Sequence, residues 1–189
     1  MSNPTHLSVP ILTTTRFVVR PFQEKDLAAF ARYRANDEVT KYQSWSDYSI
    51  DDAMSLFKRM DYSRFGENDS WWQLAIASQN EDDLVGDIAV HFVDEDQIEI
   101  GFTVAPDYQR QQVAFEAVSR FVEYVFTDLK RHRITATTDT LNQASYKLLE
   151  KLGFRREAHF VQNIFFKGSW GDEYQYGLLR SEFESNLKS

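Results

Sequence analysis

The sequence contains no cysteine among its 189 residues, which excludes disulfide scaffolds, cysteine-ligated zinc, iron–sulfur clusters and thiol nucleophiles. Histidine is scarce as well, and its four positions are too scattered for a metal-ligand set: His6, His91, His132 and His159. We therefore expect no metal. Only 7 glycines and 4 prolines are present, and neither a Gly-x-x-x-x-Gly-Lys-Ser/Thr nor a Gly-x-Gly-x-x-Gly loop occurs. A nucleotide-binding protein that uses either loop is therefore disfavoured.

Long hydrophobic runs and an excess of positive charge are also missing. No stretch approaches the ~18 apolar residues of a membrane span, and the start Met1-Ser2-Asn3-Pro4 lacks the pattern of a signal peptide. We therefore expect a cytoplasmic protein with no membrane partner. The net charge of −8 argues against a partner such as nucleic acid. It favours a cationic partner such as an amine, although it also serves simply to keep a protein dissolved.

What is present fits one globular domain. Hydrophobic residues make up 42% of the chain, and no repeat or long linker marks a domain boundary. We expect a flexible N-terminal segment over residues 1–11 and a single domain over 12–189. Alternating hydrophobicity predicts strands at 16–20, 71–77, 84–92, 97–104, 132–138, 160–166 and 172–179. Helical periodicity predicts helices that begin near Asp26, Ser49, Val113 and Asn142.

The order of these elements indicates the fold class. Three consecutive strands joined by short acidic turns form an antiparallel meander. The third of them, 97–104, is followed by the long helix from Val113 and then by strand 132–138. Such a strand–helix–strand crossover places two parallel strands in one sheet. The sequence therefore predicts an α+β fold with a mostly antiparallel sheet of about seven strands, one parallel central pair and about four flanking helices.

The junction between strand 97–104 and the long helix is the most informative part of the sequence. A helix N-terminus that follows a strand presents unpaired N–H groups and the positive end of the helix dipole, which together bind phosphate. The connecting residues resemble the Gln/Arg-x-x-Gly-x-Gly/Ala motif of the Gcn5-related N-acetyltransferases (GNAT), with Gln109 and Ala114 at the first and last positions. Arg110 and Gln112 stand where the family has glycine, which is costly if the backbone needs a positive φ.

Two further stretches resemble the same family. Residues 133–154 are similar to its strand, its Asn-x-x-Ser/Ala helix start and its Lys-x-Gly-Phe ending. Residues 12–22, Asp26 and 42–45 resemble the RimJ/RimL-like branch of ribosomal-protein N-terminal acetyltransferases. The resemblance spans about residues 12–179 and implies the GNAT-type acyl-CoA N-acyltransferase fold, with acetyl-CoA as the acetyl donor.

The resemblance also assigns the donor site. It implies that Phe102 and Val104 of strand 97–104 use their backbone groups to bind the pantetheine arm and to offer an N–H to the thioester oxygen. The loop amides from Gln109 to Ala114 wrap the pyrophosphate. Arg110 adds a guanidinium that forms charge-assisted bonds with phosphate. Asn142 is expected as a plain N-cap, as a contact to CoA, or as both. The expected donor-binding residues are Phe102, Thr103, Val104, Gln109, Arg110, Gln111, Gln112, Val113, Ala114, Asn142 and Ser145.

Glu99 is the candidate for the general base. Strand alternation puts it on the more polar face of its strand, beside the expected thioester. There it serves as a base, directly or through water, as a counter-ion for the substrate amine, or only as a surface residue. Asp87 and His91 share one face of the neighbouring strand and are held in reserve.

Ser145 is the candidate for the group that assists the leaving thiolate, because the resemblance assigns it a hydrogen bond to the CoA sulfur. The tyrosine that much of the family uses as the acid is replaced here by Leu149. Tyr146 points about a hundred degrees away from Ser145 and is only a second choice. Three tryptophans are aromatic enough to line an acceptor pocket, although core packing explains them as well: Trp45, Trp71 and Trp72.

Two classes of function follow from these observations. The first is an acetyl-CoA-dependent N-acetyltransferase that acetylates a primary amine through a tetrahedral intermediate. Its acceptor is a protein N-terminus, for example of a ribosomal protein, or a small amine such as a polyamine or an aminoglycoside. The second is a non-catalytic CoA-binding or regulatory module, which the departures from the family motif at Arg110, Gln112 and Leu149 suggest. The resemblance leaves a homodimer open.

Overall fold

The structure is a computed structural model that describes residues 7–43 and 45–187. Its strands and helices, in chain order, are β1 (Leu12–Thr13), β2 (Phe17–Pro21), α1 (Leu27–Arg34), α2 (Asp37–Thr40), α3 (Ile50–Arg59), β3 (Ser70–Ser78), β4 (Leu84–Phe92), β5 (Gln97–Val104), α4 (Val113–Thr127), β6 (Arg133–Asp139), α5 (Gln143–Lys151), β7 (Arg155–Phe166), β8 (Ser169–Leu179) and α6 (Arg180–Asn186). Short 3₁₀ helices lie at Glu24–Asp26, Tyr62–Arg64 and Pro106–Tyr108. Among these described residues, no helix has the length and apolar character needed to cross a membrane.

The strands belong to one sheet, whose order is β1-β2-β3-β4-β5-β6-β8-β7. Neighbouring strands are antiparallel, except that β5 and β6 run parallel because α4 crosses between them. The predicted α+β class with one parallel central pair is confirmed. In the described ranges the sheet has eight strands, where about seven were expected. Six α-helices accompany it, where about four were expected. The prediction missed β1, α2 and α6, whose 2, 4 and 7 residues are too few to show a hydrophobic period.

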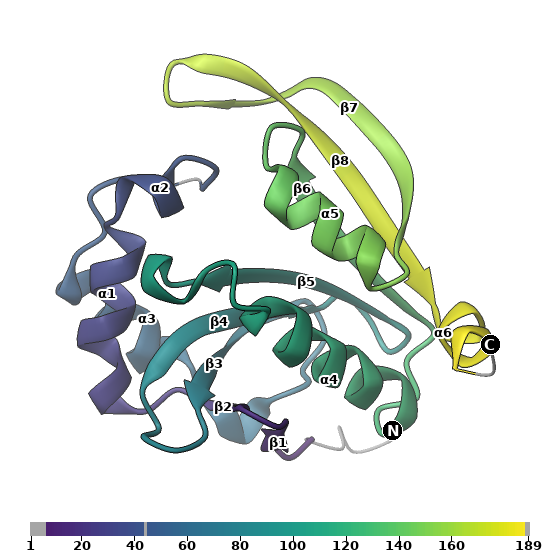
Figure 1. Cartoon of the computed structure of the whole chain (residues 1–189), viewed down its shortest axis with the longest axis horizontal. Helices are drawn as coiled ribbons and strands as arrows, with labels where there is room; N and C mark the ends of the chain where they lie inside the picture. The colour runs from purple at the N-terminus through teal and green to yellow at the C-terminus, as the bar shows by residue number, and fades with distance from the viewer. Residues whose placement is uncertain (1–6, 44, 188–189) are drawn as a thin grey trace.

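Helices cover both faces of the N-terminal half of the sheet (Figure 1). α4 packs on one face, where Phe121 is fully buried in the main core cluster. α1 and α3 pack together on the other face, in a second cluster that includes Phe30 and Ala53. Successive β3 residues divide between these clusters, Ile76 in the first and Ala75 in the second, because strand side chains alternate between the two faces.

Local signals in the sequence set the helix ends. Ser49 caps α3: its hydroxyl accepts from the N–H of Asp52, and the Asp52 carboxylate accepts from the N–H of Ser49. Gly153 follows α5 with a φ of +90°, which glycine adopts without strain. Both ends lie where the sequence predicts them.

β7 and β8 form a long hairpin that extends past α5 toward α2 (Figure 1). Both strands are longer than predicted. The first half of β7 carries charged, exposed residues without alternation, and β8 begins within residues 167–171, which separate the two predicted strands. At the hairpin tip, the ammonium of Lys167 donates to the carbonyl of Thr40 at the end of α2. The tip of the hairpin is thereby joined to the N-terminal half of the fold.

The chain before β1 is packed from the first described residue. The N–H of Leu7 donates to the carbonyl of Phe65 at 3.1 Å, and Pro10 is buried. Residues 1–6 of the segment predicted to be flexible lie outside the described residues. For residues 7–11, the bond of Leu7 and the burial of Pro10 attach the chain to the core, and the flexibility expected for this segment stays a prediction.

Candidate active site

β5 and β6 separate after a short paired stretch. They pair at three positions, the last of which sets Glu99 opposite Thr135. Farther along, β5 stays paired with β4 as far as Val104, while β6 stays paired with β8 as far as Asp139. Within the described chain, one edge of β5 therefore has no strand partner beyond Glu99. Its backbone groups along this edge are available to a ligand.

Two cavities open at this gap. The outer groove has a volume of about 560 Å³ and is lined by the end of β5, the loop that follows it and the first turn of α5. The inner cavity has a volume of about 330 Å³ and is lined by residues of α1, β4, β5, β6 and β8. Six residues line both: Tyr42, Gln43, Phe102, Thr103, Asn142 and Ser145. The two cavities therefore meet at one place on β5, beside the start of α5.

The loop between β5 and α4 presents a row of backbone donors to the outer groove. The N–H groups from Arg110 to Phe115 donate to no acceptor among the described residues. α4 has 15 residues, so the positive end of its dipole also points here. Free amides and a helix N-terminus together suit a phosphate group, which is the role that the sequence predicts for this loop.

Two of the loop residues occupy the left-handed region of backbone space. Arg110 has a φ of 59° and Gln112 a φ of 63°. The loop therefore follows the path that glycine would favour, although neither residue is glycine. Gln112 is also anchored, because its Oε1 accepts from the Nζ of Lys151 at 2.9 Å. The departures from the glycine motif change the side chains at the groove and leave the left-handed turn in place.

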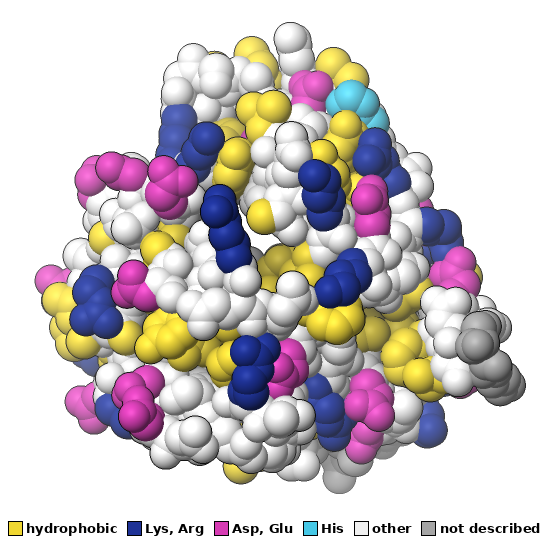
Figure 2. All heavy atoms as spheres, viewed as in Figure 1, with side chains coloured by type: hydrophobic (Ala, Val, Ile, Leu, Met, Phe, Trp, Pro, Cys, Tyr) yellow, Lys and Arg dark blue, Asp and Glu magenta, His cyan; other side chains and the backbone are white. Residues whose placement is uncertain are grey.

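Basic side chains surround the groove, although the chain carries a net charge of −8. Figure 2 shows a hollow near the centre of this face, between β5 and α5 of Figure 1, with Lys and Arg side chains around its rim. Arg110 lines the outer groove itself. Local positive charge therefore adds to the helix dipole in favouring an anionic ligand.

Ser145 lies where the two cavities meet, on the first turn of α5. Asn142 precedes it as the N-cap of the helix, and its side-chain oxygen accepts from the N–H of Ser145 at 3.2 Å. The N-cap role of Asn142 is thus confirmed, and its contact with CoA stays a prediction. The hydroxyl of Ser145 has no protein partner among the described residues. It is free to donate a hydrogen bond to a ligand at the junction.

Two other positions considered for the acid do not supply a hydroxyl there. Leu149 is 1% exposed and brings only apolar atoms to the inner cavity. Tyr146 lines neither cavity and packs edge-on against Tyr174, with 5.8 Å between ring centroids. Of these three residues of α5, Ser145 alone brings a hydroxyl to the junction.

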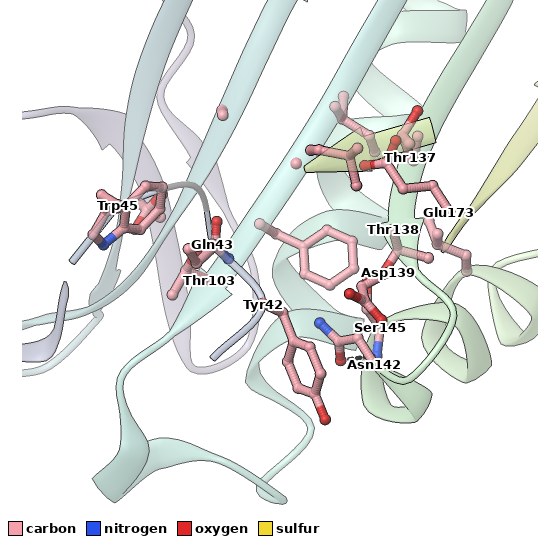
Figure 3. A pocket seen from close by; sticks show the side chains of 18 of the residues that line it. Tyr42, Gln43, Trp45, Thr103, Thr137, Thr138, Asp139, Asn142, Ser145 and Glu173 are labelled. Carbon is pink, nitrogen blue, oxygen red and sulfur yellow. Dashed lines mark hydrogen bonds between the residues drawn. The ribbon is translucent and has the colours of Figure 1, made fainter. Parts of the chain in front are cut away.

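The inner cavity has charges on two facing sides (Figure 3). Asp139, at the end of β6, and Glu173, on β8, lie on one side. Trp45 marks the other side, and the guanidinium of Arg34 lies 4.2 Å from the centre of its ring. Arg34 and Asp87 also line the cavity. An amine that enters this cavity meets carboxylates on more than one wall.

Asp87 is the centre of a buried polar cluster on β4. Its carboxylate accepts from the hydroxyl of Tyr33, from the amide of Gln73 and from Nη2 of Arg34, the last at 3.3 Å. Burial raises the pKa of Asp87, against the opposing charge of Arg34 and these hydrogen bonds. Burial and the neighbouring carboxylate raise the pKa of Tyr33 well above its usual value. Three donors therefore hold the Asp87 carboxylate in one orientation.

Glu99 lies near the start of β5, before the junction residues Phe102 and Thr103, and lines neither cavity. It shares a strand face with Gly101 and Thr103, as the alternation predicts. Its side chain is 31% exposed, and Oε2 lies 3.6 Å from Nδ1 of His91, whose ring stacks on Trp71 at 4.6 Å. Glu99 therefore faces the same side of the sheet as Thr103 but is not brought to the junction. Its role as the base stays a prediction.

The three tryptophans occupy different places. Trp45 lines the inner cavity, and its indole N–H donates to the carbonyl of Arg34 at 3.1 Å. Trp72 is buried in the core, and Trp71 lies outside both cavities. Trp45 is therefore the one of the three that an acceptor in the inner cavity can touch.

The sequence analysis missed several polar residues around the inner cavity: Tyr33, Arg34, Gln73, Asp139 and Glu173. They come from four different elements, α1, β3, β6 and β8, and only the strand register and the packing of α1 bring them together. Asp139 offered the one usable signal, because it directly follows the predicted strand 132–138 at the open end of the sheet.

Comparison with known proteins agrees with this fold. The sequence profile of the acetyltransferase (GNAT) domain matches residues 16–155. The uncharacterized N-acetyltransferase YnaD of Bacillus subtilis (strain 168) is 32% identical over 173 residues, which are 91% of this chain and 98% of the relative. The crystal structure of an acetyltransferase (GNAT family) from Bacillus anthracis has a TM-score of 0.82 and 30% identity, and the match covers 91% of this chain and 99% of that one. The chain therefore belongs to the GNAT acetyltransferase family, and it is an N-acetyltransferase whose donor is acetyl-CoA.

More distant matches have named substrates. The spermidine N-acetyltransferase of Vibrio cholerae, solved in complex with CoA and spermine, has a TM-score of 0.77 and 21% identity, over 89% of this chain and 98% of that one. The ribosomal protein uS5 alanine N-acetyltransferase of Escherichia coli (strain K12) is 24% identical over 91% of this chain and 92% of the relative. The first of these matches shows the fold alone.

Proposed function

We propose that the protein transfers an acetyl group directly from acetyl-CoA to a primary amine while both substrates are bound. The observation that carries this proposal is that the outer groove and the inner cavity meet at Thr103 and Ser145, in the gap between β5 and β6. A donor in the groove and an acceptor in the cavity present their reacting atoms to each other at this junction.

The outer groove holds the donor in this proposal. The free edge of β5 at Phe102 and Val104 binds the pantetheine arm in the manner of an added strand. The loop amides from Arg110 to Ala114 bind the pyrophosphate. Nε2 of Gln109 donates to the carbonyl of Val104 at 3.1 Å and so fixes the start of the loop against the strand.

The chemistry requires one proton to leave the amine before attack, because an ammonium group has no lone pair. The neutral nitrogen then attacks the thioester carbonyl and forms the C–N bond. The oxygen of the tetrahedral intermediate becomes negative, and a backbone N–H of β5 near Thr103 stabilises it. The intermediate collapses by breaking the C–S bond. The leaving thiolate accepts a hydrogen bond from Ser145 and becomes the thiol by taking the second proton that the nitrogen releases.

We assign the removal of the first proton to Glu99, acting through water. The Cα atoms of Glu99 and Thr103 lie roughly 13 Å apart at about 3.3 Å per strand residue, so direct contact with the amine is excluded. Gly101 lies between them on the same face, and its missing side chain leaves room for water above the strand. Asp87 is paired directly with Thr103 in the sheet, but three donors already occupy its carboxylate.

The proposed acceptor is a protein N-terminal α-amine or a small amine. The RimJ/RimL-like residues near the N-terminus and the name of the Escherichia coli relative support the first class. The Vibrio cholerae structure with spermine supports the second. Asp139 and Glu173 attract the cationic form of either acceptor into the inner cavity.

Two measurements test this function against the alternative of a non-catalytic CoA-binding module. Calorimetry with acetyl-CoA measures donor binding, and release of free CoA thiol is followed with N-terminal peptides, polyamines and aminoglycosides. We expect saturable binding, amine-dependent thiol release and intersecting double-reciprocal lines, which indicate a ternary complex. Tight binding without thiol release from any amine would favour the module. Parallel lines would contradict direct transfer.

A further inference from the structure

Arg34 is a buried cation in the wall of the inner cavity. Its side chain is 9% exposed, and it lines the cavity from the end of α1. The guanidinium carbon lies 4.3 Å from the ring centre of Phe30 and 4.2 Å from that of Trp45. Stacked rings fix the plane of the guanidinium, so its N–H groups point outward along the edge of that plane.

The polar edge of Arg34 is only partly used. Nη2 donates to Asp87 at 3.3 Å, a long bond for a charged pair. Nε is buried and has no hydrogen-bond partner among the described residues. Because Nε is buried, a ligand in the cavity meets the terminal N–H groups of Arg34 instead. The Asp87 carboxylate is shared among several donors, because Tyr33 and Gln73 also donate to it.

The opposite side of the cavity carries carboxylates that lack a cation. Asp139 accepts from the N–H of Leu141 at 2.7 Å, and Glu173 accepts from the side-chain amide of Asn163 at 2.6 Å. Neither carboxylate forms an ion pair with a described residue. Figure 3 shows both across the cavity from Trp45, the residue that stacks on Arg34. The cavity therefore has a guanidinium, paired with Asp87, on one side and two carboxylates without a cation on the other.

We infer that the acceptor is a small zwitterion, an amine that also carries a carboxylate, as free amino acids do. This inference rests on the proposed function and narrows its acceptor class. The carboxylate accepts hydrogen bonds from the terminal N–H groups of Arg34 at the cavity wall, and the amine lies toward Asp139 and Glu173, near the junction with the donor groove. A polyamine has no group for Arg34, and a peptide N-terminus offers only a neutral carbonyl. The volume of about 330 Å³ suits a molecule of amino-acid size.

The first test uses the unaltered enzyme and matched acceptors. Each set consists of an L-amino acid, its carboxamide and the amine left after loss of the carboxylate, and kcat/KM is expressed per concentration of unprotonated amine. A charge-assisted contact predicts a preference of roughly 10- to 100-fold for the amino acid over both analogues. Equal or better use of the decarboxylated amine, or of a C-terminally amidated peptide, would overturn the inference and leave the proposed acetyl transfer intact. Absence of transfer to every acceptor would overturn both.

The second test changes Arg34 and follows the preference itself. In Arg34→Gln, the ratio of kcat/KM for the amino acid to that for its decarboxylated analogue should fall toward one, mainly through KM. Arg34→Lys keeps the charge and should retain part of the ratio. Removal of the partner of a buried carboxylate can destabilise the fold, so the melting temperature and acetyl-CoA affinity of each variant are measured alongside. An unchanged ratio in a folded Arg34→Gln protein would overturn the inference.

A binding measurement gives a readout without turnover. Calorimetry with the N-acetylated amino acid, in the presence of CoA, should show at least tenfold weaker binding for Arg34→Gln than for the unaltered protein. Asp107→Asn is a suitable control, because this exposed side chain lines neither cavity. Equal binding by folded Arg34→Gln would show that the guanidinium makes no contact with the carboxylate.

Discussion

Arg16 and Glu116 form an ion pair, with 2.8 Å between Nη2 and Oε2, that joins the start of β2 to the first turn of α4. The same guanidinium donates to the carbonyl of Gln111 at 2.9 Å. Glu116 also accepts from the hydroxyl of Thr14 at 2.7 Å and from the N–H of Arg16 at 2.8 Å. Thr14 and Arg16, which precede β2, therefore hold the loop of the outer groove at the start of α4, and the loop amides keep their positions without a glycine motif.

Replacing Glu116 by glutamine should destabilise the protein in a pH-dependent way. Burial by itself raises the pKa of Glu116, but the hydrogen bonds from Thr14 and Arg16 and the charge of Arg16 outweigh it, so the pKa is lowered. A lowered pKa contributes stability above the unfolded value of about 4.3, and this stability is lost as the pH falls through the folded value. We expect Glu116→Gln to lower the free energy of unfolding by about 1 kcal/mol at pH 7, after allowance for the partial exposure of Glu116. This difference should shrink below pH ~4.

Urea unfolding of both proteins between pH 3 and pH 8 measures this difference. Glu123→Gln is a matched control on the same helix, because Glu123 is 52% exposed and its ion pair is with the nearby Arg120. The control should change stability by less than about 0.5 kcal/mol. A Glu116→Gln loss of the same size at pH 3 and pH 7 would show that the charge of Glu116 is not its cause.

Replacing Gln112 by glycine should preserve or improve acetyl-CoA binding. Gln112 holds a left-handed φ of 63°, which costs a non-glycine residue roughly 1–2 kcal/mol. Glycine removes that cost and loses only the exposed hydrogen bond from Lys151. We expect the Kd for acetyl-CoA, measured by calorimetry, to stay within about threefold or to fall.

Gln112→Val provides the opposite test at the same position, because a β-branched side chain is strained at this φ. It should weaken binding at least about fivefold. A large loss in Gln112→Gly would instead show that the glutamine side chain itself contacts the donor.

The elements with a strong local pattern were predictable, and those set by tertiary context were not. The meander β3–β5, the crossover through α4 and the ends of α3 and α5 follow from alternation, helical period and caps in the sequence. β1 has 2 residues and depends on β2 for its backbone bonds, so no period identifies it. The first half of β7 is charged and exposed, and β8 alone makes it a strand.

The candidate site divides in the same way. The loop that ends at Ala114 and the start of α5 were found because each is a contiguous motif with its own backbone chemistry. Arg34 and Glu173 could not be predicted from the sequence because they are more than a hundred positions apart. They line one cavity only through the register of the sheet. Glu99 was placed on the correct strand face, but alternation does not say how far along that face the cavity extends.

Replacing Ser145 by alanine should lower turnover more than acetyl-CoA affinity. The hydroxyl lies at the junction of the two cavities without a protein partner among the described residues, so its loss leaves the fold and the loop amides unchanged. We expect kcat to fall about 10²-fold and the Kd for acetyl-CoA to change by less than about threefold. Single-turnover thiol release and calorimetry measure the two quantities. Ser55→Ala, on the exposed side of α3, is the control, and unchanged turnover in Ser145→Ala would remove Ser145 from the mechanism.

Gly86 and Gly101 offer a matched pair of substitutions on β4 and β5. A Cβ added at Gly86 would lie 2.5 Å from the carbonyl oxygen of Thr103. This oxygen is a backbone atom, so it cannot rotate away as the end of a flexible side chain can. Gly86→Ala should therefore push β5 away from β4 at the junction, cost about 1–3 kcal/mol of stability and weaken acetyl-CoA binding several-fold. A Cβ at Gly101 meets only the methyl group of Ala89, at an ordinary 3.8 Å.

Gly101→Ala should accordingly change stability by less than about 0.5 kcal/mol. Gly101 lines the inner cavity but not the outer groove, so the substitution should raise the acceptor KM and leave acetyl-CoA affinity unchanged. Urea unfolding, calorimetry with acetyl-CoA and steady-state kinetics with one acceptor separate the two variants. If Gly86→Ala bound acetyl-CoA as tightly as the unaltered protein, the backbone of β5 at Phe102 and Val104 would not be a donor contact. If Gly101→Ala weakened acetyl-CoA binding and left the acceptor KM unchanged, the assignment of donor and acceptor to the two cavities would be reversed.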